Sequence, residues 1–475
     1  MAGERREGRR ATVLVAAVAL VTGALAMAPA GAAVPAPSTP PAAPSAVLAP
    51  VGLSATAPSA AETSALVARV RAVLAAKPVG RDVAASVVDV STGTPLLADG
   101  ATRPQLPAST LKVLTAVTVL HALGPDTRLT TQVVAGATPG RIVLVGGGDA
   151  TLTRSSSART WPAGQAARPA SLDALAVATA KALTRAGTTS VSVSVDDSLF
   201  TGPRTAPGWP ASFVGEGVVA PVTALAVDQG RAGPATGAGP RVADPSITAG
   251  QVFATRLAAA GIRVTGGVAR ATAPQGAAPL AAVSSPTVAD LVERMLTQSD
   301  DDLAEALAHL AGGRIGGAAS FSGGAAATES TMRDLGVPMT GAVLDDGSGL
   351  SGRDRLTTTT LVETLAALAR PGLGGVSTGD PSATAVAPLW AAVTGLPVAG
   401  ATGTLTDRFV GPVNAAGRGV VRAKTGTLTG VNALAGLVRD VRGRLLAFAF
   451  VADASPGPQE LARGSLDRAA SALVP

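Results

Sequence analysis

One segment of the sequence, from Ser109 to Leu123, restricts the possible folds most strongly. Its apolar residues lie on more than one face of a helix, so a helix over this segment has to be buried on several sides. The chain is long enough to bury it, since 475 residues exceed the usual size of one hydrophobic core. The sequence therefore predicts a buried central helix in a protein of two or three domains.

The composition is that of a folded protein and excludes several classes of function. Hydrophobic residues make up 47% of the chain and charged residues 15%, which is typical of folded proteins. Aromatic residues make up 2% and Tyr is absent, so stacking surfaces for single-stranded nucleic acid are scarce despite a net charge of +6. With no Cys and two His, we expect neither a metal site nor another cofactor. The two histidines leave one catalytic Ser-His-Asp triad arithmetically possible.

The N-terminus has the pattern of an export signal. Four arginines precede an apolar run at residues 11–28, and small residues follow, which predicts a signal peptide over residues 1–33. The alternative is a retained membrane anchor, because about eighteen apolar residues approach the length that spans a bilayer. Residues 34–61 are rich in Pro, Ala and Ser and predict an extended linker. We expect an exported protein of the cell wall or an equivalent extracellular space, with possible membrane association.

Beyond the linker, the apolar patterns predict both helices and strands. The region between residues 124 and 285 has frequent Gly and Pro and short β-like stretches, so we interpret it as an accessory α+β region. A helix-rich segment resumes at residue 287. The predicted elements are a helix at 62–76, a hairpin at 82–98, strands at 141–145 and 191–195, a helix at 172–185 and a hairpin at 432–452.

Lysine is rare, with four among 38 basic residues, and two lysines stand in patterns that suit catalysis. Unlike Arg, a buried Lys near another cation can lose its proton near neutral pH and act as a general base. Lys112 follows Ser109 by three positions, so on a helix the amine and the hydroxyl share one face. This arrangement suits a nucleophile and its base, although Ser109 could instead only cap the helix.

Two further polar patterns follow later in the chain. Lys424-Thr425-Gly426-Thr427 directly precedes the C-terminal hairpin, and its alternative interpretation is a polar turn before a strand. The chance of finding both lysine patterns by coincidence is about one in a hundred, so together they indicate function. Ser299-Asp300-Asp301 precedes an apolar helical pattern and could be no more than a helix start with acidic residues in its first turn.

Ser-x-x-Lys, Ser-x-Asn and Lys-Thr-Gly, in this order, are the motifs of penicillin-binding proteins and serine β-lactamases. The sequence resembles the D-alanyl-D-alanine carboxypeptidase/endopeptidase family of low-molecular-mass penicillin-binding proteins, which has a long insertion after the first motif. The long stretch between Ser109 and Ser299 matches that insertion. Further stretches that resemble the family are Gly146–Asp149, Asp346–Ser351, Leu396–Gly400 and Gly403–Leu405.

The resemblance implies an α/β (α+β) fold. A transpeptidase/β-lactamase-like domain, with a central antiparallel sheet flanked by helices, would be built from residues 62–123 and 286–475. Residues 124–285 would be an inserted accessory α+β domain or domains. The implied enzyme is a serine peptidase that cleaves the D-Ala-D-Ala ends or the cross-links of peptidoglycan stem peptides through an acyl-enzyme. β-Lactams would be its covalent inhibitors.

The resemblance also implies a role for each motif residue. Ser109 would be the nucleophile, Lys112 its base, and Ser299 the relay of a proton to the leaving amine. Lys424 would supply a positive field and, with Thr425, would hold the substrate carboxylate. Backbone N–H groups of Ser109 and Thr427 would form the oxyanion hole. Gly426 and Asp301 complete the expected substrate-binding residues, and no metal is expected.

Asp301 departs from the family, which has Asn at this position. An ionised Asp only accepts hydrogen bonds, whereas Asn would also donate to a substrate carbonyl. A carboxylate here would also favour the protonated form of Lys112, which works against a neutral base. Two alternative functions stay open. One is a serine β-lactamase with the same motifs, which the long insertion disfavours. The other, which Asp301 makes conceivable, is a catalytically impaired protein that binds the cell wall.

Overall fold

The computed structural model describes the chain from residue 59 to residue 474, apart from six internal gaps. The predicted signal peptide lies outside the described residues, as does nearly all of the predicted linker. In the described residues, no helix is both long and apolar enough to cross a membrane. The described ranges are 59–76, 79–80, 82–157, 167–233, 239–369, 389–455 and 458–474.

The first sheet is antiparallel throughout and joins early and late segments of the chain. Its strand order is β2-β1-β11-β10-β9. Strands β10 and β11 are buried along almost their whole length, as expected for strands covered on both faces. Both predicted hairpins are present. The strands are β1 (Asp82–Asp89), β2 (Pro95–Asp99), β9 (Arg422–Leu428), β10 (Val431–Arg439) and β11 (Leu445–Asp453).

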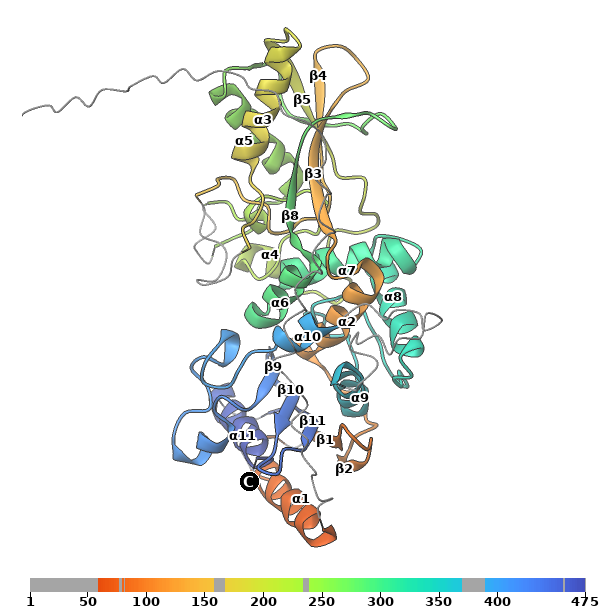
Figure 1. Cartoon of the computed structure of the whole chain (residues 1–475), viewed down its shortest axis with the longest axis vertical. Helices are drawn as coiled ribbons and strands as arrows, with labels where there is room; N and C mark the ends of the chain where they lie inside the picture. Colours follow the sequence, from red (N-terminus) through yellow and green to blue (C-terminus); the bar gives the residue numbers. More distant parts are fainter. Residues whose placement is uncertain are drawn as a thin grey trace, which may run out of the picture. The chain divides into compact units, whose positions relative to one another are not determined.

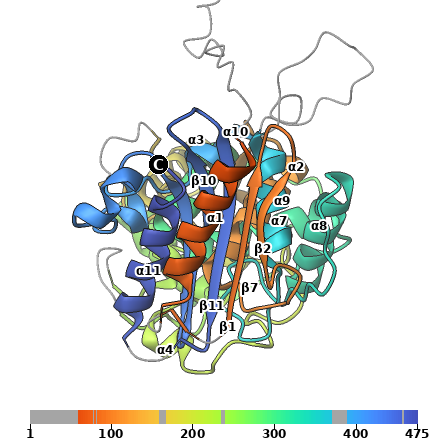
Figure 2. The ribbon, with the colours of Figure 1, turned by 90° about the horizontal axis from the view of Figure 1, so that it is seen from below.

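Helices cover both faces of this sheet, as Figure 2 shows. Helices α1 (Ala60–Leu74) and α11 (Gln459–Ser471) pack together on one face, and α9 (Thr358–Ala369) packs on β1 and β11 from the other. Side chains alternate accordingly, since Phe448 belongs to one hydrophobic cluster and its neighbour Ala447 to the other. The predicted fold, a central antiparallel sheet flanked by helices, is confirmed.

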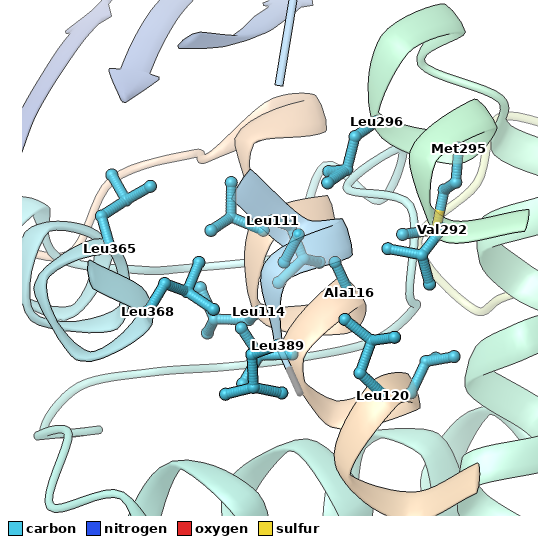
Figure 3. Close-up of a cluster of buried hydrophobic side chains, with 14 of the residues drawn as sticks. Leu111, Leu114, Ala116, Leu120, Val292, Met295, Leu296, Leu365, Leu368 and Leu389 are labelled. Carbon is cyan, nitrogen blue, oxygen red and sulfur yellow. The ribbon is translucent and has the colours of Figure 1, made fainter. Parts of the chain in front are cut away.

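The predicted central helix is also present and is buried on several sides. It is α2 (Lys112–Leu123), preceded by a 3-10 turn, η1 (Ala108–Leu111), so Ser109 lies just before the α-helix rather than in it. Figure 3 shows the leucines of η1 and α2 among side chains of α6, α9 and Leu389. The helices packed against α2 are α6 (Val288–Gln298), α7 (Asp301–Ile315), α8 (Phe321–Asp334) and α9.

A second sheet forms from the segment between α2 and α6 (Figure 1). Its order is β6-β5-β4-β3-β8, with β7 beside β5; β3 pairs antiparallel with β4 and β8, whereas β4 and β5 are parallel. The predicted strands and helix of this region are present, and the sequence patterns missed β3, β8 and α5. The elements are β3 (Arg128–Ala135), β4 (Arg141–Val145), α3 (Leu172–Arg185), β5 (Ser190–Asp196), α5 (Pro245–Ala259), β6 (Arg263–Val264), β7 (Ala269–Arg270) and β8 (Pro279–Thr287).

Short helices connect these elements in the described residues. They are α4 (Phe213–Glu216), η2 (Asp228–Gly230), α10 (Trp390–Thr394), η3 (Gly403–Leu405) and η4 (Pro412–Gly417). Of these, η3 contacts β9 and α6, which places it beside the Lys424 segment.

Candidate active site

Ser109 and Lys112 meet where η1 leads into α2. Helical geometry puts side chains three residues apart on one face, and Lys112 Nζ lies 3.1 Å from Ser109 Oγ. The first residue before α2 is Leu111, and within the described residues no side chain caps this helix start. The alternative that Ser109 only caps the helix is therefore wrong.

Lys112 is fully buried and has three hydrogen-bond partners in the described structure. Besides Ser109, its Nζ lies 2.5 Å from Asp301 Oδ1 and 2.7 Å from the Ser348 carbonyl oxygen. A protonated amine donates three hydrogen bonds, whereas a neutral amine donates two and accepts one. A carbonyl and an ionised carboxylate only accept, so Ser109 is the partner that can donate to a neutral Lys112. The geometry suits transfer of the Ser109 proton to Lys112.

The second motif lies at the junction of α6 and α7. Ser299 ends α6 in the left-handed conformation, with a φ of 56°. Asp300 caps α7 by accepting a hydrogen bond from the Leu303 N–H at 3.1 Å. Asp301 therefore turns to Lys112 instead of capping the helix. Burial raises the pKa of the Asp301 carboxyl, although the positive charge of Lys112 opposes this shift.

Residues from the region of the second sheet hold the start of α7 in place. Arg241 forms a buried ion pair with Asp302, with Nη2 and Oδ2 2.8 Å apart. Gln229 Nε2 donates to Asp300 Oδ1 at 2.6 Å. The inserted region thus positions the second motif through side-chain contacts. The sequence analysis missed these residues, because no local motif distinguishes Arg241 from the many other arginines.

The third motif lies within strand β9, so the alternative of a polar turn before a strand is wrong. Lys424 is fully buried, and its Nζ lies 2.9 Å from Ser299 Oγ and 2.9 Å from the Thr425 carbonyl oxygen. Burial, reinforced by the charge of Lys112, lowers the pKa of Lys424 well below its usual value. At Gly426, a Cβ would lie 2.8 Å from the Pro107 carbonyl oxygen. Glycine therefore lets β9 approach the turn that carries Ser109.

The three motifs meet at one cavity of about 240 Å³. Among its described lining residues none is acidic, and guanidinium and hydroxyl groups together suit an anion. The sequence analysis missed Arg408 and Arg463, which have no motif around them, and gave Thr404 no role, although Thr404 Oγ1 lies 2.9 Å from Thr425 Oγ1. The lining residues are Ser109, Ser299, Thr404, Arg408, Thr425, Thr427 and Arg463.

The two arginines of the cavity are held differently. Arg408 Nη2 lies 2.6 Å from Asp467 Oδ1, so a buried carboxylate balances its charge. Arg463, on α11, donates to the uncharged Gln459 Oε1 at 3.3 Å. Arg463 is thus a cation of the lining that a ligand can neutralise. In the described residues, no group of three or more His, Asp or Glu side chains is placed to hold a metal ion.

Comparisons with known proteins agree with this geometry. The chain is similar to carboxypeptidase Rv3627c of Mycobacterium tuberculosis, 37% identical over 94% of this chain and 90% of that protein. It is also similar to carboxypeptidase DacB of Mycolicibacterium smegmatis, 36% identical over 97% of this chain and 93% of that protein.

A solved structure and a family profile extend the comparison. Penicillin binding protein 4 (dacB) from Haemophilus influenzae shares the fold, with a TM-score of 0.68 and 20% identity over 84% of this chain and 97% of that chain. The profile of the D-Ala-D-Ala carboxypeptidase 3 (S13) family matches residues 66–240 and 231–473. From its motifs and these matches, the chain belongs to the D-Ala-D-Ala carboxypeptidase 3 (S13) family and is a peptidase.

Proposed function

We propose that this enzyme is a serine peptidase that cleaves the D-Ala-D-Ala end of peptidoglycan stem peptides through an acyl-enzyme on Ser109. The observation that carries the proposal is the 3.1 Å contact between Ser109 Oγ and Lys112 Nζ, beside a cavity that Ser299 and Thr425 also line. A nucleophile needs an adjacent base, and Lys112 is the base within hydrogen-bond reach.

In acylation, Ser109 Oγ attacks the carbonyl carbon of the penultimate D-Ala and its proton passes to Lys112. Backbone N–H groups of Ser109 and Thr427 stabilise the oxyanion. The C–N bond then breaks, and Ser299, which accepts a hydrogen bond from Lys424, relays a proton to the leaving amine. Water hydrolyses the ester, which releases the shortened peptide and restores Ser109.

This mechanism needs a neutral Lys112 and a positive charge on Lys424. Asp301 lies beside Lys112 and stabilises a positive charge there, whereas burial lowers the pKa of Lys424. Both effects favour a proton on Lys112 over one on Lys424, which is the opposite of what this mechanism needs. Asp301 therefore slows acylation without removing any of the reacting groups.

The substrate itself reduces this handicap. The leaving D-Ala carries a carboxylate, and Thr425 and Arg463 face the cavity where that carboxylate binds. Its negative charge favours a proton on nearby Lys424, and thereby a neutral Lys112. The same subsite accepts any peptide with a carboxylate on the carbon next to the scissile nitrogen, so the proposal includes cleavage of cross-links of that chemistry.

The first test is mass spectrometry after incubation with penicillin. We expect a covalent adduct on Ser109 and none on the Ser109→Ala variant. An adduct on another serine, or undiminished labelling of the variant, would refute the assignment. A slow deacylation rate distinguishes the peptidase from a β-lactamase. Complete absence of labelling would favour a protein that only binds the cell wall, which the Asp301–Lys112 contact makes a specific second candidate.

The place of action is a separate proposal. The basic and apolar N-terminal sequence supports export, with cleavage near residue 33 and action at the cell wall. N-terminal sequencing of the protein secreted by an expressing cell tests this. A start near residue 34 supports a cleaved signal, whereas an intact N-terminus in the membrane fraction supports the retained anchor.

A further inference from the structure

The loop of residues 346–351 forms one wall around Lys112. Its Ser348 carbonyl accepts the hydrogen bond from Lys112 Nζ at 2.7 Å. Gly349 has a φ of 82°, and a Cβ there would lie 2.0 Å from the Ala108 carbonyl oxygen. The loop therefore packs directly on the turn that carries Ser109. Whatever fixes this loop also fixes the orientation of the Lys112 amine.

Glu305, one helical turn after Asp301 on α7, binds the backbone of this loop. Its side chain is fully buried, and both carboxylate oxygens accept hydrogen bonds from backbone N–H groups. Oε1 accepts from Ser348 at 2.8 Å, and Oε2 accepts from Gly347 at 3.0 Å. From the opposite side, Thr115 Oγ1 of α2 donates to the Gly347 carbonyl at 2.6 Å. The loop is thus held between α7 and α2.

A second buried acid of the loop, Asp346, fixes its remaining backbone. Asp346 accepts from the Gly349 N–H at 2.7 Å and from Trp209 Nε1 at 2.7 Å. Asp354 lies close by, and burial raises the pKa of Asp354 to about 10. Its Oδ1 accepts a hydrogen bond from the Asp345 N–H at 2.8 Å.

We propose that Glu305 is a positioning residue of the reaction, whose carboxyl group fixes the Ser348 carbonyl on Lys112 through two backbone N–H groups. The inference rests on the proposed function, because it assigns Glu305 to the base of that reaction. Glu305 accepts hydrogen bonds from the backbone of the segment that contacts Lys112, whereas Asp354 accepts from the Asp345 N–H, outside the 346–351 loop. The two buried acids therefore differ in which backbone they hold, and this difference can be tested.

The charges around Lys112 determine which pH effect to expect. Titratable groups that face Lys112 include Asp301, Lys424 and Glu305, and burial raises the pKa of Glu305 well above its usual value. The Ser348 carbonyl stabilises the protonated amine by accepting its hydrogen bond. If the loop moves away, Lys112 loses this acceptor, so its neutral form becomes more favourable while its orientation toward Ser109 is lost. A positioning role therefore changes both the acylation rate and its pH profile.

The experiment makes the same chemical change, acid to amide, at both positions. Glu305→Gln puts an amide N–H against a backbone N–H and displaces the loop. We expect its second-order acylation constant with penicillin to fall about 30-fold and the acidic limb of the pH profile to move to lower pH. Asp354→Asn keeps an acceptor for the Asp345 N–H. We expect its constant to stay within about three-fold of the wild-type value.

Each outcome decides between the inference and the function it rests on. If wild-type enzyme is not acylated at Ser109, the proposed function fails. If wild-type enzyme reacts and folded Glu305→Gln reacts at the same rate, or more slowly with an unchanged pH profile, Glu305 is not a positioning residue. Circular dichroism verifies folding. If Glu305→Gln does not fold, Thr115→Val tests the same loop by releasing it from α2. A fall of about five-fold in the acylation constant, with the same shift of the pH profile, supports the inference. An unchanged pH profile overturns it.

Discussion

The two buried lysines of the active site, Lys112 and Lys424, have opposite electrostatic surroundings. Lys112 contacts the Asp301 carboxylate, and Glu305 lies behind its carbonyl partner. Lys424 contacts the hydroxyl of Ser299 and a backbone carbonyl, and the positive charges of Lys112 and Arg408 act on it against the negative charge of Asp301. Both side chains are fully buried, so burial does not separate their roles. The neighbouring charges, and not burial, therefore distinguish the two lysines.

This contrast divides the site into an acidic flank and a basic flank. The acidic flank comprises Asp301 and Glu305 around the base. The basic flank comprises Lys424, Arg408 and Arg463 around the carboxylate subsite. The division separates proton transfer from substrate binding. Substitutions on the two flanks should therefore affect different kinetic constants.

The largest expected effect comes from exchanging lysine for arginine on each flank. Lys112→Arg should lower the acylation constant about 1,000-fold, nearly as much as removal of the side chain, because Arg cannot act as a neutral base. Lys424→Arg should be milder, since it keeps the positive charge. Stopped-flow acylation by one penicillin measures both. If Lys112→Arg stayed active and Lys424→Arg did not, the flanks would have been assigned the wrong way round.

A smaller effect should mark the carboxylate subsite. Arg463→Gln should raise KM about 20-fold for a peptide ending in D-Ala-D-Ala, because a charged hydrogen bond is lost. KM for the same peptide with a C-terminal amide should stay constant. Arg468→Gln is the matched control, since Arg468 lies on the same helix and donates to Ser465 Oγ. An equal change for both peptides would contradict a role in carboxylate binding.

Asp301→Asn should raise the acylation constant about ten-fold, since the amide donates to the substrate carbonyl and no longer stabilises charge on Lys112. Asp301 contacts Lys112 at 2.5 Å, so the substitution acts on the base directly. Second-order constants with one penicillin decide the outcome. Equal constants, or a slower variant, would show that Asp301 does not handicap this enzyme.

The smallest kinetic effect is expected at Asp354, whose substitution should change stability instead of catalysis. The pKa of Asp354 is raised from 3.8 to about 10, so the folded protein binds a proton that the unfolded chain releases above pH 4. The stability from this group is full below pH 4 and declines as pH rises toward 10. Asp354→Asn removes this decline. Between pH 5 and 9 the wild-type Tm should fall roughly 6 °C more than that of the variant, and parallel curves would contradict a protonated Asp354.

Local patterns predicted much of the fold. The hairpins at 82–98 and 432–452, the helix at 172–185 and the buried helix after Ser109 depend on residues close in sequence. Strands β3 and β8 of the second sheet escaped prediction, and they pair with each other across about 150 residues, although β3 also pairs with nearby β4. A strand that depends on a distant partner gives a weak local signal.

The sequence by itself determined the contact of Ser109 with Lys112, because three-residue spacing on helical backbone brings the two side chains together. Only the tertiary structure decided how that lysine is used. Asp301 contacts Lys112 across 189 residues, and Glu305 contacts Ser348 across 43. Such contacts arise from the packing of α7 against α2 and the loop, which no local spacing encodes. The nucleophile and its base could therefore be read from the sequence, whereas the charges that tune them could not.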